Sequence, residues 1–98
     1  MHAVVWTYRI APGAAVAFEA LYGAEGDWAR LFRRDPAYLG TELYRDAADP
    51  ARYLTIDRWR SRAACDAFLQ AARADYAALD ARGDALTLEE TRLAAVDA

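Results

Sequence analysis

The side chains that most often do chemistry in proteins are scarce in this sequence. Among its 98 residues are one histidine, His2, and one cysteine, Cys65. A Ser-His-Asp arrangement needs a firmly held histidine, and a terminal residue such as His2 is seldom held in that way. The sequence also has no glycine-rich phosphate-binding loop. Serine hydrolase and nucleotide-binding chemistry are therefore set aside, and His2 is not favoured as a general base.

Metal and thiol chemistry find little support either. One histidine, one cysteine and one methionine cannot form a cluster of metal ligands, so we expect no metal site. A single cysteine cannot form an internal disulfide, which favours a reducing, cytoplasmic location. Cys65 falls on an apolar helical stripe, where a small buried side chain is favoured over a nucleophile. We expect no signal peptide, and no membrane span because no apolar stretch reaches about 18 residues.

Charge and composition narrow the class of partner. The net charge is −3, every basic residue is an arginine, and the longest basic run is the pair Arg33-Arg34. Binding to nucleic acid is not expected, because it requires a clustered basic face. The nearest approach to one is Arg58, Arg60 and Arg62, which we interpret as solvated arginines at a strand end. With 56% hydrophobic residues, the chain is expected to fold as a single domain over residues 1–98.

The spacing of apolar residues predicts the elements that must position any site. Dense β-branched and aromatic residues predict strands, and a repeat of three to four residues predicts helices. Pro12 suits a first helical turn, Asp27 a second helix start, and Ser61 the N-cap of a long helix. In chain order we expect a strand over 2–10, helices over 12–22 and 28–34, strands over 37–45 and 52–59, and a helix over 62–83.

The C-terminal segment has two possible interpretations. Thr87 and Glu90 have the spacing of a helix capping box, but residues 87–96 can also form a strand, which we favour because the sheet needs an edge there. The order then matches the split βαβ arrangement of a ferredoxin-like α+β fold, with a four-stranded antiparallel sheet and helices on one face.

A sheet covered on one face only leaves the other face open. We expect this open face to carry five apolar side chains, Val4, Trp6, Tyr8, Leu54 and Ile56. Apolar patches of this size usually mark an interface. The pattern therefore predicts a homodimer formed through the sheet face opposite the helices.

Two segments carry a family pattern. Residues 38–43 read Tyr-Leu-Gly-Thr-Glu-Leu, and residues 52–61 read as a strand followed by Trp59, Arg60 and Ser61 at a helix start. Their order and spacing resemble those of antibiotic-biosynthesis-monooxygenase domains, from the start of the chain to about Tyr76. The resemblance implies a dimeric α+β barrel with a pocket between sheet and helices in each subunit. Some members oxygenate polyphenols or quinols without metal or flavin, others degrade haem, and many have no known activity.

The resemblance also argues against haem degradation. Thr7 stands where haem-degrading relatives carry asparagine, and Phe68 stands where many members carry histidine and haem degraders carry tryptophan. The axial histidine of haem degraders would fall near Tyr76, whereas the only histidine of this chain is His2.

The candidate site is located from two positions that match the family, together with the alternation of side chains along a strand. If Thr7 and Phe68 mark the pocket side, alternation puts Asp57 and its strand neighbours there as well. Asp57 is then either a general base with a raised pKa or the ion-pair partner of Arg9, Arg58 or a helix arginine. The expected substrate-binding residues, each of which could instead be ordinary core, are Thr7, Tyr53, Thr55, Trp59, Phe68 and Tyr76.

These expectations lead to two functional hypotheses. The first, implied by the family resemblance, is a monooxygenase that needs no cofactor and oxidises a small aromatic, polyphenolic or quinol substrate with O₂. The second is a dimeric module without catalytic activity that binds a small ligand or supports a pathway partner. Haem degradation is the least favoured alternative.

Overall fold

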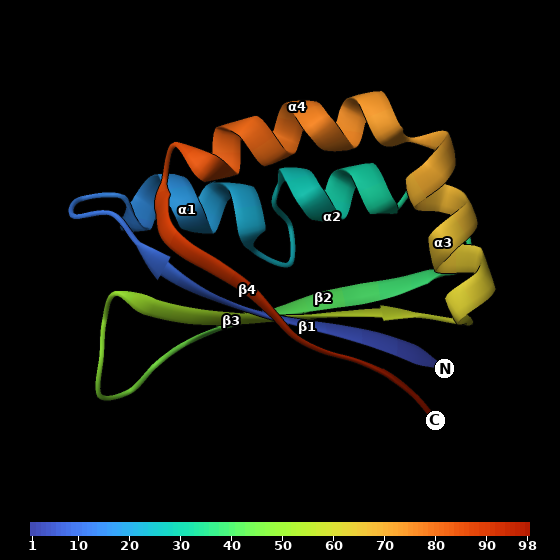
Figure 1. Cartoon of the computed structure of the whole chain (residues 1–98), viewed down its shortest axis with the longest axis horizontal. Helices are drawn as coiled ribbons and strands as arrows, with labels where there is room; N and C mark the ends of the chain where they lie inside the picture. Colours follow the sequence, from blue (N-terminus) through green and yellow to red (C-terminus); the bar gives the residue numbers. More distant parts are fainter.

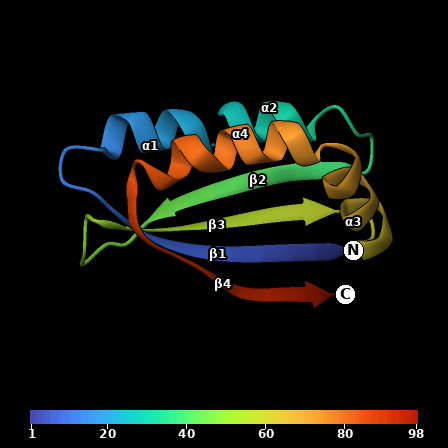
Figure 2. The same ribbon diagram turned by 45° about the horizontal axis from the view of Figure 1, so that its top comes forward.

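The computed structural model describes all 98 residues and shows one antiparallel sheet with helices over one face (Figure 1). The strands are ordered β2-β3-β1-β4 across the sheet, with β4 at the edge beside β1 (Figure 2). The predicted ferredoxin-like α+β fold is confirmed. The elements are β1 (His2–Ile10), α1 (Ala15–Tyr22), α2 (Asp27–Phe32), β2 (Tyr38–Arg45), β3 (Arg52–Trp59), α3 (Arg62–Ala71), α4 (Arg73–Asp84) and β4 (Thr87–Asp97).

The C-terminal segment is the predicted strand, and the alternative of a capped helix is wrong. The Thr87 hydroxyl donates to the Gly83 carbonyl at 3.1 Å, so it closes the end of α4 instead of starting a new helix. Strand β4 then pairs with β1 from Ile10 opposite Thr87 to His2 opposite Asp97. This pairing holds the two ends of the chain side by side.

The expected long helix is two helices. It breaks at Ala72, where φ is −98° and ψ is 21°, and α3 runs at an angle to α4 (Figure 1). The Ser61 cap is confirmed, since its hydroxyl accepts the Ala64 N–H at 3.1 Å. At the other end of the chain, α1 begins at Ala15 because Gly13, with φ of 77°, forms a turn that prevents Pro12 from starting the helix. None of the helices has the length and hydropathy of a membrane-spanning segment.

The register between β1 and β3 decides which face each side chain occupies. Trp6 pairs with Thr55 and Tyr8 with Tyr53, and directly paired residues share one face of a sheet. Tyr8 packs against Phe18 of α1 with ring centroids 5.2 Å apart, so this face lies under the helices. The prediction that Val4, Trp6 and Tyr8 lie on the open face is therefore wrong, because alternation separates two faces without saying which one is covered.

Aromatic rings pack between the sheet and the helices and form much of the core. Phe18 is fully buried, stacks on Tyr22 at 4.3 Å and contacts Tyr53 at 4.7 Å. Near the other end of the sheet, Phe32 lies 5.4 Å from Trp59 in an edge-to-face arrangement. Offset and edge-to-face aromatic pairs of this kind stabilise a core beyond the area that they bury.

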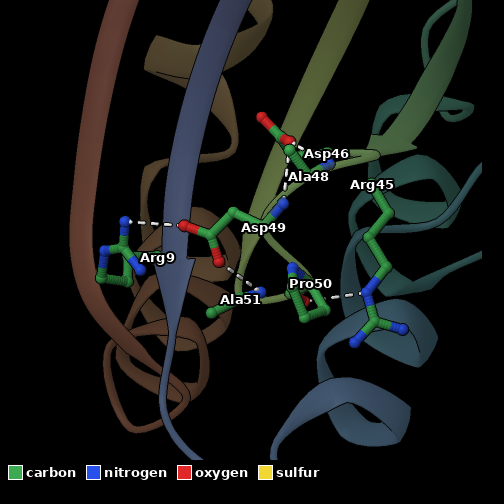
Figure 3. A network of polar contacts seen from close by, with 7 residues as sticks. All are labelled: Arg9, Arg45, Asp46, Ala48, Asp49, Pro50 and Ala51. Atoms are coloured by element: carbon green, nitrogen blue, oxygen red, sulfur yellow. Dashed lines mark hydrogen bonds and ion pairs between the residues drawn. The ribbon is translucent and has the colours of Figure 1, made fainter.

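The turn between β2 and β3 is held by two aspartates (Figure 3). Asp46 accepts the backbone N–H groups of Ala48 and Asp49, and Asp49 accepts that of Ala51 at 3.0 Å. The second carboxylate oxygen of Asp49 accepts a hydrogen bond from Arg9 of β1, also at 3.0 Å. The turn is thereby tied to the neighbouring strand.

Gly83 is required by a close approach between helices, which leads to a first prediction. A Cβ at this position would lie 2.1 Å from the Tyr22 hydroxyl. Gly83→Ala should lower the free energy of unfolding by about 2 kcal/mol despite the better helix propensity of alanine. In a Tyr22→Phe background the same substitution should cost less than half as much, because the hydroxyl is gone. Urea denaturation of the four proteins measures this coupling, and additive effects would contradict the close contact.

Candidate active site

A cavity of about 480 Å³ lies between the sheet and the helices. This volume lies in the range of small-molecule sites, roughly 300 to 1,000 Å³. Hydrophobic residues make up 13 of the 21 that line it. The strands contribute residues including His2, Val4, Trp6, Thr55, Asp57 and Trp59, and the helices contribute residues including Trp28, Phe32, Leu69 and Tyr76.

Asp57 is the carboxylate at the sheet side of this cavity. The Thr41 hydroxyl donates to Asp57 Oδ1 at 2.5 Å. Because that proton is committed, the Tyr38 hydroxyl must donate to Thr41 Oγ1, also at 2.5 Å. Burial raises the pKa of Asp57 to about 6, and the hydrogen bond from Thr41 opposes the rise. Asp57 is thus a carboxylate that can both release and accept a proton near neutral pH.

No arginine neutralises Asp57, so its interpretation as half of an ion pair is wrong. Arg9 pairs with Asp49 at 3.0 Å, and Arg58 pairs with Glu42 at 2.8 Å. Arg58 follows Asp57 directly in a strand, so its side chain points to the opposite face of the sheet. A partly buried carboxylate without a counter-charge is unfavourable for folding and is typical of functional sites.

His2 also lines the cavity, although its terminal position did not favour a role for it. Its Nδ1 lies 2.7 Å from Asp97 Oδ1, and only 3% of the residue is exposed. The argument that a terminal residue is poorly held fails because β1 is paired on both sides there, with Trp59 and Asp97 opposite His2. Donation of Nδ1–H to Asp97 would leave Nε2 free to accept a proton. The signal available in the sequence was the alternation of His2 with Val4 and Trp6.

Three of the predicted substrate-binding residues, Thr55, Trp59 and Tyr76, line the cavity together with Asp57. Thr55 and Tyr8 share a hydrogen bond between their hydroxyls at 2.8 Å. Tyr76 meets Trp28 edge-to-face with ring centroids 4.7 Å apart. Burial raises the pKa of Tyr76 to about 12, so its phenol stays protonated at neutral pH.

The other three predicted residues, Thr7, Tyr53 and Phe68, do not line the cavity. Thr7 pairs with Leu54, which places it on the open face of the sheet and makes its expected position wrong. The Tyr53 hydroxyl donates to Glu19 at 2.5 Å, away from the cavity. Phe68 packs against Trp59 at 5.5 Å and supports that ring within the core.

Three carboxylates at the junction of α4 and β4 are the only group of side chains close enough to bind a cation together. Oxygen atoms of Asp80, Asp84 and Glu90 lie within 4.8 Å of one another, and none of these residues forms a salt bridge. Glu90 also lines the cavity. Burial raises the pKa of Glu90, and the charges of Asp80 and Asp84 raise it further. The cluster was not foreseen because it depends on the pairing of β4 with β1.

Comparison with known proteins identifies relatives of this architecture. The sequence model of antibiotic biosynthesis monooxygenase matches residues 1–78. No curated protein sequence matches the chain. Among solved structures, SnoaB, a cofactor-independent oxygenase from Streptomyces nogalater, superposes with a TM-score of 0.78 at 21% identity, covering 99% of this chain and 91% of SnoaB. A putative antibiotic biosynthesis monooxygenase from Nitrosomonas europaea gives 0.76 at 14% identity, over 100% and 98% of the two chains. At these identities the likeness shows the fold alone.

The environment of Asp57 predicts a pH-dependent stability difference. A raised pKa in the folded state means that ionisation of Asp57 opposes folding, so stability falls as the pH rises from about 4 through about 6. Asp57→Asn should therefore be more stable than the parent protein at pH 8, by about 2 to 3 kcal/mol, with the difference vanishing near pH 4. Urea denaturation at a series of pH values measures it.

The matched control is Asp49→Asn, for which the opposite sign is expected. The Ala51 backbone N–H and the Arg9 side chain hold the pKa of Asp49 below its ordinary value. That substitution should therefore reduce stability at neutral pH and lose its effect in acid. Equal effects of both substitutions at every pH would contradict the uncompensated charge of Asp57.

Proposed function

The chain belongs to the antibiotic biosynthesis monooxygenase family, and from this premise we propose that it is a cofactor-independent monooxygenase acting on a small phenolic or quinol substrate. The observation that carries the proposal is Asp57, a partly buried carboxylate with a pKa of about 6 and no counter-charge. It lies beside a cavity that has seven aromatic residues among the 21 that line it. Family membership alone leaves the reaction open, because one fold supports several chemistries.

The proposed reaction balances without an external reductant. A phenol with a free para C–H and one O₂ give a para-quinone and one water, so one oxygen atom enters the ring and the other leaves as water. Asp57 accepts the phenolic proton, which produces an electron-rich phenolate. The phenolate supplies the electrons that reduce O₂, a C–O bond forms at the para carbon, and the O–O and para C–H bonds break. The water receives one proton from the para carbon and the phenolic proton from Asp57.

The surrounding residues support each part of this role. Thr41, backed by Tyr38, donates to one oxygen of Asp57 and leaves its other oxygen available to the substrate. Trp6, Trp28 and Tyr76 provide flat apolar walls that suit an aromatic ring. His2, held by Asp97, provides a second proton acceptor at the same cavity.

Oxygen consumption tests the proposed function. With a panel of phenols, hydroquinones and 1,8-dihydroxy-9-anthrone, the protein should accelerate O₂ uptake above the rate without enzyme. Asp57→Asn should lower kcat/KM by about 100-fold or more, the usual contribution of a general base. In the parent protein kcat/KM should rise with pH through about 6, because only the ionised carboxylate accepts a proton. His2→Gln separates the contribution of the second base.

The control for this experiment is Asp75→Asn, which changes an exposed carboxylate paired with Arg34. Its activity should equal that of the parent protein. Absence of O₂ uptake across the whole panel, with the same ligands binding, would overturn the oxygenase and favour a module that only binds small molecules. Full activity of Asp57→Asn would remove Asp57 from the mechanism.

We also propose that the chain, a single 98-residue domain, forms a homodimer through the open face of its sheet. Leu54 and Ile56 lie on this face opposite Thr7 and Val5 and are only half-buried. Tyr44 and Val96 extend the apolar surface and are about half exposed, at 52% each. A partner over this face would remove these side chains from water, which favours association.

The dimer leads to a prediction on the oligomeric state. The parent protein should elute as a dimer in light scattering at micromolar concentration. Leu54→Lys would bury a charge in the proposed interface and should shift the mass toward the monomer. Val16→Lys is the control, since Val16 is 85% exposed on the helix side. A parent protein that is monomeric, or a dimer disrupted equally by both substitutions, would contradict this interface.

A further inference from the structure

Two buried polar atoms at the cavity have no hydrogen-bond partner. They are the Tyr22 hydroxyl and the Trp28 indole nitrogen, and no other fully buried side-chain nitrogen or oxygen is in this state. Both residues line the cavity, and they are only 4% and 7% exposed. Buried polar groups in folded proteins are nearly always paired, because an unpaired group loses its bonds to water without replacement. These two exceptions therefore call for a physical explanation.

Both groups carry a proton that they can donate. The Trp28 indole nitrogen can only donate, and the Tyr22 hydroxyl has a proton to donate. The two rings are neighbours, with centroids 6.2 Å apart. Burial and the nearby charge of Glu90 raise the pKa of Tyr22, so the hydroxyl keeps its proton. The Trp28 indole N–H, which approaches this hydroxyl without hydrogen-bond geometry, opposes the rise. The pair thus offers two donor protons at residues that line the cavity.

The charges around the pair limit what it can bind. Asp80, Asp84 and Glu90 act on Tyr22 with negative charge, and no salt bridge neutralises them. A carboxylate, sulfate or phosphate would be repelled there. A neutral carbonyl oxygen has two lone pairs, which suit two donors, and no net charge. An aromatic ring attached to that carbonyl would lie among the apolar and aromatic walls of the cavity.

We propose that Tyr22 and Trp28 form a subsite for the neutral carbonyl oxygen of an aryl ketone or quinone. The pair belongs to α1 and α2, whereas Asp57 belongs to the sheet on the other side of the cavity. A ligand bound in this way is held by its carbonyl at the helices while the rest of its ring system lies toward the sheet. The subsite deepens the proposed function, since it names a second recognition element of the substrate or quinone product, and it rests on the same cavity.

Binding of 1-indanone compared with indane tests the subsite. The two ligands share a ring system and differ in one carbonyl, and neither has a phenol to be oxidised. In calorimetry the parent protein should bind 1-indanone at least fivefold more tightly than indane, as one or two hydrogen bonds predict. Tyr22→Phe and Trp28→Phe should each weaken 1-indanone binding about fivefold and leave indane binding unchanged.

A spectroscopic measurement separates recognition from packing. The infrared carbonyl stretch of ¹³C-labelled 1-indanone should shift to lower frequency in the parent protein and return toward its unbonded value in Tyr22→Phe. The control is Tyr53→Phe, which removes a buried hydroxyl outside the cavity, one that donates to Glu19. That variant should bind and shift 1-indanone as the parent does. Thermal unfolding should show no loss of stability in Tyr22→Phe, because an unpaired hydroxyl contributes nothing favourable to the fold.

Specific outcomes would overturn the subsite. One is equal binding of 1-indanone and indane by the parent protein. The other is a carbonyl frequency of bound 1-indanone that is the same in the parent protein, Tyr22→Phe and Trp28→Phe, which would mean that water alone satisfies the two donors. The oxygenase can fail independently. A protein that binds 1-indanone more tightly than indane but consumes no oxygen would overturn the proposed reaction and leave the subsite intact. A protein that consumes oxygen but binds the two ligands equally would overturn the subsite alone.

Discussion

The pairing of β1 with β3 brings Trp6 opposite Thr55 and Tyr8 opposite Tyr53, and so assembles one continuous surface for the helices to cover. A shift of this register by one residue would exchange every side chain of β1 between the two faces. Trp6 and Tyr8 would then leave the cavity and the core, and Thr7 would replace them. The aromatic layer, the cavity and the position of Asp57 all follow from this single alignment.

The same alignment explains why the polar groups of the site are buried. Val4 and Thr41 are the cross-strand partners of Asp57, so the carboxylate has a hydroxyl on one side and an apolar residue on the other. The next residue, Arg58, forms an ion pair with Glu42 on the open face of the sheet. The strand therefore separates the carboxylate from the nearest cation in the sequence. Burial raises the pKa of Asp57, and only the Thr41 hydrogen bond opposes the rise.

Local patterns were enough to predict the fold, because β1, β3 and the Ser61 cap are encoded by neighbouring residues. They were insufficient wherever the position or burial of a residue depends on contacts with a different helix or strand. The face of Thr7 depends on strand register, the burial of His2 depends on a partner 95 residues away, and the break at Ala72 leaves the apolar periodicity almost unchanged. The cluster of Asp80, Asp84 and Glu90 likewise arises only when β4 pairs with β1. What sequence reasoning missed was therefore the long-range part of the site.

One physical property is shared by Asp57, Tyr22 and Trp28. Each has a polar group that loses contact with water and does not regain all of the lost interactions within the protein. A chain selected for stability alone would replace them with asparagine and phenylalanine, or pair them internally. Violations of local rules that gather around one cavity are typical of functional sites, because a ligand can supply the missing partners. A ligand that binds only the folded protein also raises its stability by mass action. The unsatisfied groups and the cavity are therefore best understood together, as a site whose hydrogen bonding is completed by what it binds.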